Sequence, residues 1–283
     1  MEKIIPIVKA DGTEEPFKLS KLQSSLKRLG VLRGDIEAIV QEVSDEVREG
    51  NSTNDIYHKV YTKLQQTNNR TAAARYSLRR ALFDLGPSGF PFESFVAEIF
   101  RAKGYRARTG VMLRGHCSKH EIDVLAEKRM ERIGAELKFH NNLGMKTDLK
   151  VALYVHARFE DIHTHAVSVT GGIDVTRRLL ITNTKFTKNA IDYAACVGLE
   201  LIGWSYPKKG NLEDLIEETG LHPLTCLTSL STQEKQRLLE TKVVLCKTLK
   251  DNPDIMRKSG IKESKVASVL KESEVLCVPG AAV

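Results

Sequence analysis

The chain has 283 residues, of which 41% are hydrophobic and 28% are charged, as in an ordinary globular protein. No run approaches the roughly 18 consecutive apolar residues of a membrane helix, and the N-terminus lacks the apolar run of a secretory signal. We therefore expect a cytoplasmic protein with no membrane partner. The net charge of +7 favours an anionic partner. Five scattered cysteines, none spaced as C-x-x-C, indicate reduced thiols.

The first 85 residues predict a β-hairpin followed by small helices. Strand-forming residues precede Asp11-Gly12, which is a strong hairpin-turn signal, and Phe17 closes the return strand. Apolar residues at helical spacing then predict four helices, which begin near Ser20, Asp35, Thr53 and Thr71. Ser20 and Thr53 are residue types that cap helix N-termini. The run Gly86-Pro87-Ser88-Gly89 breaks the pattern and predicts a domain boundary.

Several short motifs between residues 3 and 85 occur in an order typical of one known domain. They are Ile7-Val8-Lys9-Ala10-Asp11-Gly12-Thr13-Glu14-Glu15-Pro16-Phe17, Lys21-Leu22, Ser25-Leu26, Thr53-x-x-Ile56 and Ala73-Ala74-Arg75-Tyr76. Together they resemble the ATP-cone domain, which implies a regulatory module that binds ATP or dATP. The resemblance implies that Lys9 and Lys21 contact the phosphates. It also places Val8, Glu15 and Thr53 around the nucleoside.

By spacing alone, the two lysines also fit solvated surface positions. Their chemistry nevertheless suits the role, because two ammonium groups near a tight turn can neutralise a triphosphate. The sequence therefore leaves both interpretations of Lys9 and Lys21 open, and the resemblance favours phosphate binding.

A helix over residues 92–103 and a strand over 105–113 precede two strands with clear period-two alternation. The first runs through Glu121-Ile122-Asp123-Val124, and the second runs from Ile133 to His140. A four-residue loop, Lys128-Arg129-Met130-Glu131, would join them as a hairpin. If Glu127 then pairs with Arg132, Asp123 lies opposite Glu136 and Glu121 lies opposite Lys138. Directly opposed residues point to the same face, with Cβ atoms about 5 Å apart.

One sheet face would therefore carry Asp123, Glu136 and Lys138. Carboxylates from two strands, together with water and a phosphate oxygen, suit a hard divalent cation such as Mg²⁺. The metal would stabilise charge on a phosphate, and a neighbouring lysine could orient the attacking water. By spacing alone, the same residues also fit a surface ladder of ion pairs.

The surrounding sequence has further features in a recognisable order. They are Phe92-Glu93, Gly104-Tyr105, Glu121-Ile122-Asp123-Val124, Glu136-Leu137-Lys138, Leu179-Leu180-Ile181-Thr182-Asn183, Phe186-Thr187-x-x-Ala190 and Leu199-Glu200-Leu201-Ile202-Gly203-Trp204. Over roughly residues 90–206 they resemble the PD-(D/E)xK nuclease superfamily, in its Mrr-type restriction-endonuclease branch. The resemblance implies a mixed sheet flanked by helices and hydrolysis of DNA phosphodiester bonds with Mg²⁺ or Mn²⁺.

By this resemblance, Asp123 and Glu136 are metal ligands and Lys138 is the catalytic lysine. Glu93 corresponds to a helix glutamate that often completes the site. A solvated glutamate in a helical first turn is the alternative for Glu93, since the helix dipole favours it there.

Two smaller patterns carry less information. His116-Cys117-x-x-His120 has zinc-ligand residue types, but its spacing matches no standard zinc module, so we expect a basic loop. A run of basic residues could follow a DNA backbone or form a solvated face. It comprises Arg101, Lys103, Arg106, Arg108 and Arg114.

Residues 211–276 predict a helical segment, which could bind DNA backbone, dimerise or pack on the core. The expected fold is mixed α/β in three parts: an ATP cone at 1–88, a nuclease-like core at 89–207 and a helical segment at 208–283. The leading hypothesis is an ATP- or dATP-regulated DNA endonuclease that dimerises to cut both strands. The alternatives are a non-catalytic, nucleotide-sensing DNA-binding protein and a structure-selective nuclease of the Holliday-junction type.

Overall fold

The computed structural model describes residues 5–9, 12–67, 70–86 and 88–279, and the chain divides into two compact units. The helical unit combines Met1–Ala81 with His222–Val283 and the short stretch Asn142–Gly144. The sheet unit combines Leu82–Asn141 with Met145–Leu221. None of the described helices is long and apolar enough to cross a membrane.

The N-terminal part of the helical unit begins with a short hairpin, in which β1 (Pro6–Val8) pairs antiparallel with β2 (Glu14–Pro16). Ile4 and Asp11 of the predicted hairpin lie outside the described residues. The helices that follow are α1 (Leu19–Arg28), α2 (Arg33–Glu46), α3 (Thr53–Gln66), α4 (Arg70–Tyr76) and α5 (Leu78–Phe83). The apolar faces of α1 to α4 bury a common core that includes Leu26, Val43 and Val60.

Three details of these helices differ from the prediction. The N-cap of α3 is Ser52, not Thr53, and Ser52 forms a capping box with Asp55. Helix α1 begins at Leu19 without a side-chain cap, so Ser20 lies inside it. The helix expected near 71–85 is interrupted at Ser77, whose hydroxyl donates to the carbonyl of Ala74 at 2.8 Å. Such local bonds compete with regular helix geometry.

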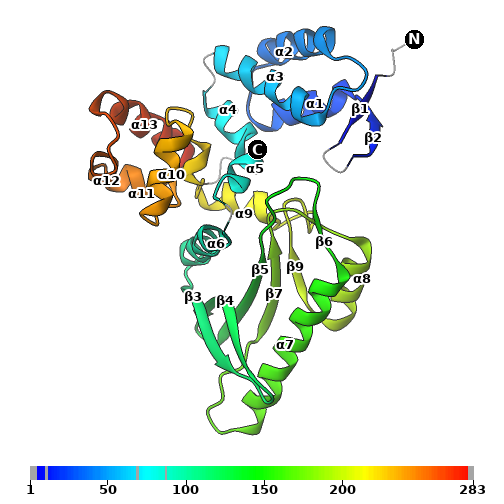
Figure 1. Ribbon diagram of the computed structural model, residues 1–283, viewed down its shortest axis with the longest axis vertical. Coiled ribbons are helices and arrows are strands. Elements are labelled where there is room, and N and C mark those ends of the chain that lie inside the picture. Colours follow the sequence, from blue (N-terminus) through cyan, green and yellow to red (C-terminus); the bar gives the residue numbers. More distant parts are fainter. Residues whose placement is uncertain (1–4, 10–11, 68–69, 87, 280–283) are drawn as a thin grey trace. The chain divides into compact units, whose positions relative to one another are not determined.

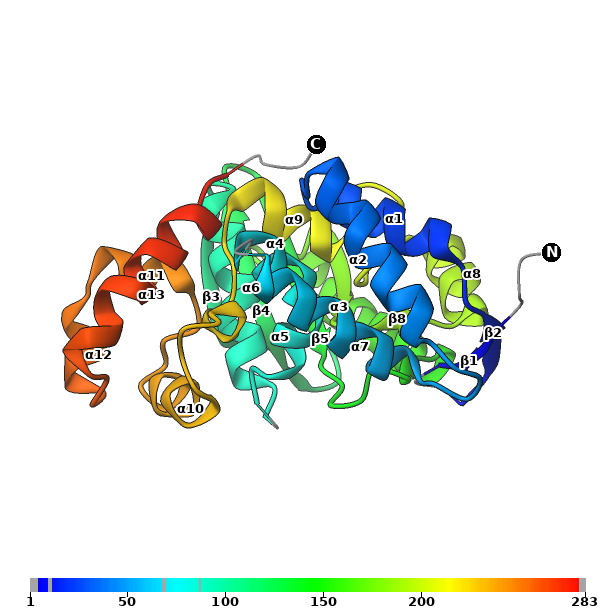
Figure 2. The ribbon, with the colours of Figure 1, turned by 90° about the horizontal axis from the view of Figure 1, so that it is seen from above.

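The C-terminal helices belong to the same unit as the N-terminal ones. They are α10 (Thr232–Glu240), α11 (Cys246–Asp251), α12 (Asp254–Lys258) and α13 (Glu263–Leu276), after the 3-10 turn η1 (Leu224–Cys226). Helix α13 packs against α11 and against α4, and α11 and α13 lie side by side in both views (Figures 1 and 2). The hydroxyl of Thr225 donates to the carbonyl of Ala81 at 2.6 Å. Segments far apart in the sequence therefore pack together in one compact unit.

The sheet unit contains a five-stranded mixed sheet of order β3-β4-β5-β7-β9 (Figure 1). Its strands are β3 (Arg106–Arg114), β4 (Lys119–Lys128), β5 (Glu131–Lys138), β7 (Arg177–Thr182) and β9 (Glu200–Ile202). The first three are antiparallel neighbours, whereas β5, β7 and β9 run parallel. Two further short strands, β6 (Lys146–Thr147) and β8 (Lys185–Phe186), pair separately.

Helices link and cover these strands. They are α6 (Phe90–Ala102), α7 (Leu149–Ser168), α8 (Lys188–Val197) and α9 (Leu212–Thr219). Parallel strands need a crossover between them, and α7 and α8 supply the two crossovers. Mixed α/β architecture with a helix-flanked sheet is therefore confirmed, with a helical segment at the C-terminus.

The β4–β5 hairpin keeps the predicted register but not the predicted loop. Glu127 pairs with Arg132 as expected. Lys128 also pairs with Glu131, so the turn consists of Arg129 and Met130 and the four-residue loop is wrong. Arg129 adopts a positive φ of 55°, which allows the tighter turn.

Helix α7 was not among the predicted elements, and it lies along one face of the sheet (Figure 1). Its buried side chains, including Val155 and Phe159, join a core with Leu125 and Leu180 of the strands. Gly134 of β5 lies against this helix, since a Cβ atom there would come within 2.7 Å of the Phe159 ring. The close approach brings the side chains of α7 to the face that carries Glu136.

Candidate active site and nucleotide-binding region

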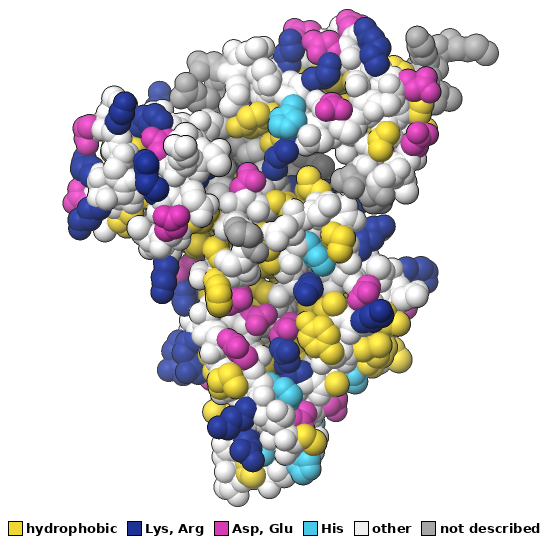
Figure 3. Space-filling view, in the orientation of Figure 1, with side chains coloured by type: hydrophobic (Ala, Val, Ile, Leu, Met, Phe, Trp, Pro, Cys, Tyr) yellow, Lys and Arg dark blue, Asp and Glu magenta, His cyan; other side chains and the backbone are white. Residues whose placement is uncertain are grey.

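Three acidic side chains from different elements lie close enough to perturb one another. Asp123 comes from β4, Glu136 from β5 and Glu93 from the first turn of α6. Burial is the largest cause that raises the pKa of Glu93, and the charges of Asp123 and Glu136 add to it. Acidic side chains are gathered on the face of the sheet unit seen in Figure 3. The structure thus brings together the three carboxylates that the sequence singled out.

Burial makes this acidic cluster costly when it is charged. Loss of hydration is the largest cause that raises the pKa of Glu136 to about 7, and the charge of Asp123 adds to it. Loss of hydration likewise raises the pKa of Glu93 to about 7. The pKa of Asp123 is raised for the same reason, although a backbone hydrogen bond opposes the shift. A bound cation or proton would lower the cost of this buried negative charge.

The cluster lies where the β4–β5 ladder ends. The recorded pairing stops at Val124 and Ala135, one pair short of the expected Asp123–Glu136 pair. The Asp123 carboxylate instead accepts a hydrogen bond from the backbone N–H of Leu137 at 2.6 Å. The Leu137 N–H of β5 therefore donates to a side chain of β4 and not to the β4 main chain. The expected pairing of Glu121 with Lys138 is also absent among the recorded pairs of these strands.

Lys138 lies on β5 two residues after Glu136 and is half-buried. Alternation along the strand places it on the same face as Glu136. Over the described parts of the chain, Lys138 forms no ion pair with a carboxylate. Its ammonium group is therefore available to a ligand.

The cation that contacts Glu136 is Arg158 of α7, which sequence reasoning missed. The Arg158 guanidinium forms an ion pair with Glu136 and donates to the carbonyl of Glu121 at 3.2 Å. Tyr154, one helical turn earlier, donates its hydroxyl to Glu136 at 3.3 Å. The i, i+4 spacing of Tyr154 and Arg158 is a signal that could have identified this pair once α7 was recognised.

The donor set fits a hard divalent cation, because it consists of carboxylate oxygens that are partly shielded from water. Asp123 and Glu136 would hold the ion. Among the described residues, no group of three or more His, Cys, Asp or Glu side chains has a metal-binding arrangement. Water and a phosphate oxygen would therefore have to complete the coordination.

The His116-Cys117-x-x-His120 loop is held by one acidic residue of α7. The Asp161 carboxylate lies 2.6 Å from His120 Nε2 and accepts from the backbone N–H of Cys117 at 2.8 Å. These bonds hold the pKa of Asp161 well below its usual range, with the His120 contact the largest cause. The pattern therefore anchors the β3–β4 turn to α7.

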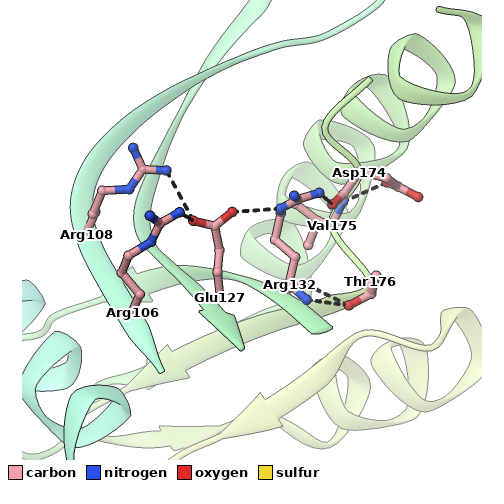
Figure 4. Close-up of polar contacts among 7 residues, drawn as sticks. All are labelled: Arg106, Arg108, Glu127, Arg132, Asp174, Val175 and Thr176. Atoms are coloured by element: carbon pink, nitrogen blue, oxygen red, sulfur yellow. Dashed lines mark hydrogen bonds and ion pairs between the residues drawn. The ribbon is translucent and has the colours of Figure 1, made fainter. Parts of the chain in front are cut away.

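Much of the basic run is neutralised locally. Figure 4 shows Arg106 and Arg108 turned towards one oxygen of Glu127 and Arg132 turned towards the other. The nitrogen–oxygen distances are 3.0, 3.4 and 3.1 Å, respectively. Lys103 pairs with Glu218 at 3.0 Å. Arg101 likewise pairs with Glu98, so four of the five residues of the run are held in ion pairs within their own unit.

The two candidate phosphate-binding lysines, Lys9 of the hairpin and Lys21 of α1, both contact one carboxylate. Glu15 of β2 lies 3.2 Å from Lys9 and 3.1 Å from Lys21. These contacts lower the pKa of Glu15, with the Lys21 hydrogen bond the largest cause. Both lysines remain substantially exposed, at 38% and 61% of their side chains.

Val8 and Thr53 are joined through Ser52. The backbone of Val8 forms an isolated bridge with Ser52, and Thr53 is the first residue of α3. Glu15, Lys21 and Thr53 line a cavity of about 190 Å³. Its other walls are mainly apolar and aromatic: Ile7, Pro16, Phe17, Leu22, Ile56, Tyr57 and Tyr76. Four of the five predicted nucleotide-binding residues therefore surround, or contact a wall of, one cavity: Lys9, Glu15, Lys21 and Thr53.

Three family models match successive parts of the chain. One described as an ATP cone domain matches residues 5–84, and one described as Restriction endonuclease matches residues 87–204. One described as AF1548-like, C-terminal, matches residues 222–277. The resemblances to an ATP cone and to a restriction-endonuclease domain are thereby confirmed.

Two relatives match this chain over almost their whole length. An uncharacterized protein of Archaeoglobus fulgidus is 36% identical over 180 residues, which cover 63% of this chain and 98% of that protein. This chain belongs to the AF1548-like family. A crystal structure of AF1548, a protein of unknown function, matches with 34% identity and a TM-score of 0.54, over 67% of this chain and 98% of that one.

Membership in the AF1548-like family names no activity, because both relatives lack an assigned function. The matched domains support, in general terms, a nuclease with a nucleotide-binding module. For this AF1548-like protein, a more specific activity has to be argued from the chemistry of the acidic cluster.

Proposed function

We propose that this protein is a Mg²⁺-dependent DNA endonuclease that ATP or dATP regulates through the N-terminal module. The acidic cluster of Glu93, Asp123 and Glu136 carries the proposal. Burial raises the pKa of all three carboxylates, and neighbouring negative charge adds to the shift in each. Charged carboxylates in such surroundings cost stability, whereas a divalent cation held by Asp123 and Glu136 would offset that cost. Mn²⁺ would serve in the same position, because it takes the same oxygen ligands.

In the proposed reaction, Asp123 and Glu136 would hold the metal, which would stabilise charge on the scissile phosphate. Lys138 orients the attacking water and contacts the phosphate from the same sheet face. Glu93, with a pKa of about 7, can accept or return a proton at the edge of the site. A double-strand cut needs two such sites, which a homodimer would supply.

The nucleotide module would bind ATP or dATP in the cavity beside the hairpin. Lys9 and Lys21 would exchange Glu15 for phosphate oxygens, and Val8 and Thr53 would border the nucleoside. The aromatic walls suit a purine base, because stacking on an aromatic ring stabilises it. If calorimetry on the full chain shows no binding of ATP, dATP or ADP, this half of the proposal fails.

The catalytic half is tested by comparing the wild type with Lys138→Ala on supercoiled plasmid, branched duplex and methylated DNA. The assay uses Mg²⁺ or Mn²⁺, with and without ATP. We expect cleavage by the wild type and a loss of at least about 100-fold in the variant, as for removal of a charge-stabilising group. Lys119→Ala, which removes an exposed lysine from the same unit, is the matched control and should cleave normally.

Three outcomes separate the alternatives. A preference for branched over linear duplex would indicate a structure-selective nuclease. No cleavage of any substrate, with DNA binding intact in both proteins, would favour a non-catalytic nucleotide-sensing binder. The lanes with ATP give the sign of regulation.

A further inference from the structure

Arg158 is placed unlike the other arginines of the sheet unit. Arg178 pairs with Glu160, and Arg177 pairs with Glu131 and Glu200, all of them outside the acidic cluster. Among the described residues, Arg158 alone forms an ion pair with a cluster carboxylate, that of Glu136. A cation from α7 therefore contacts the group that the proposed function assigns to the metal.

The contact is held in an orientation that leaves the guanidinium accessible. The Arg158 side chain is 25% exposed, whereas Glu136 is 9% exposed. The guanidinium lies 5.5 Å from the ring centroid of Tyr154, and the Tyr154 hydroxyl contacts Glu136. Tyr154 therefore steadies both partners, so Glu136 keeps a hydrogen bond if Arg158 leaves it.

We propose that Arg158 is an exchangeable cation: it neutralises Glu136 before the metal binds, and it then turns to bind the DNA phosphate. The proposal rests on the proposed function. A guanidinium presents parallel N–H donors that match a carboxylate and a phosphate equally well. A divalent cation on Glu136 would repel Arg158, and the arriving phosphate would compensate the charge of both.

Exchange of this kind makes two measurable affinities change in opposite directions when the arginine is removed. Loss of Arg158 removes a competitor for Glu136, so metal should bind more tightly. It also removes a phosphate contact, so DNA should bind less tightly, but only when metal is present. If the ion pair were purely structural, breaking it would weaken both the metal affinity and the DNA affinity.

Mn²⁺ affinity is measured by electron paramagnetic resonance or calorimetry on the full-length wild type, Arg158→Met, Arg158→Lys and Glu136→Gln. Arg178→Met is the matched control, because it breaks an arginine–glutamate pair of α7 outside the cluster. We expect Arg158→Met to bind Mn²⁺ about tenfold more tightly, which corresponds to about 1.4 kcal/mol of relieved competition. Arg158→Lys, which keeps the charge, and Arg178→Met should resemble the wild type.

DNA affinity is measured by fluorescence anisotropy at one salt concentration, with and without Mn²⁺, in a Lys138→Ala background that prevents cleavage. With Mn²⁺, Arg158→Met should weaken DNA binding about tenfold, as for a lost charged hydrogen bond. Without Mn²⁺, it should leave DNA affinity within about twofold. Arg158→Lys should weaken it less, because lysine contacts phosphate as a point charge.

Unchanged or weaker Mn²⁺ affinity in Arg158→Met would overturn the inference about Arg158. If Glu136→Gln still abolishes Mn²⁺ binding in that case, the proposed metal site stands without the exchange. Mn²⁺ binding that Glu136→Gln leaves unaltered would overturn the metal site itself and this inference with it. Mn²⁺ binding that is seen in Arg158→Met but not in the wild type would support the exchange. If Arg158→Met does not fold, wild-type DNA affinity with Mn²⁺ in Arg158→Lys would refute the phosphate contact.

Discussion

Substitution of Gly134 by alanine should destabilise the sheet unit, although the change adds a single methyl group. A Cβ atom at this position would lie 2.7 Å from Cε1 of Phe159 and 2.9 Å from Cγ1 of Val175. Both distances are far below van der Waals contact, and Phe159 is 1% exposed, so neither side chain can turn into solvent. Overpacking of this kind costs about 1–3 kcal/mol.

Calorimetry of the full chain measures this effect. At about 2–4 °C per kcal/mol, Gly134→Ala should lower the Tm of the sheet unit by several degrees. Gly34→Ala in α2 is the matched control, since no atom lies within 4 Å of its added Cβ. That control should leave the Tm unchanged or raise it slightly, because alanine favours the helix.

A double-mutant cycle isolates the steric cause. Phe159→Ala alone should cost about 3–5 kcal/mol through the cavity that it leaves. The methyl group of Gly134→Ala would occupy part of that cavity, so the double variant should be more stable than the sum of the two losses predicts. Additivity within about 0.5 kcal/mol, or wild-type stability of Gly134→Ala, would refute the close approach of α7 to β5.

Two further predictions concern the sites. Because the pKa of Glu136 is raised from 4.5 to about 7, folding holds its proton to higher pH. Stability should therefore fall as pH rises from 4.5 to 7, while Mn²⁺ binding strengthens; flat profiles in both measurements would contradict the shift. In α3, Ser52→Ala should lower the free energy of unfolding, measured by chemical denaturation, by about 1 kcal/mol. Thr53→Ala should leave stability nearly unchanged and weaken ATP binding, and the reverse pattern would restore Thr53 as the cap.

Much of the acidic cluster could be predicted from short-range patterns. Period-two alternation places Glu136 and Lys138 on one face of β5, whatever the rest of the chain does. Pairing of Glu127 with Arg132 follows from the two alternating runs, because a slip by one residue would expose the apolar face. The loop length did not follow, since a positive φ at Arg129 allowed a tighter turn.

The sequence by itself thus determined most of the elements other than α7, the family resemblances and the carboxylates on the strands. Only the tertiary structure decided that Glu136 meets Arg158, which lies 22 residues further along the chain. Helical spacing shows that α7 has two faces but does not say which strand each face will meet. The raised pKa values of Glu93 and Glu136 were also beyond the sequence, because burial and neighbouring charge arise only when separate elements pack together.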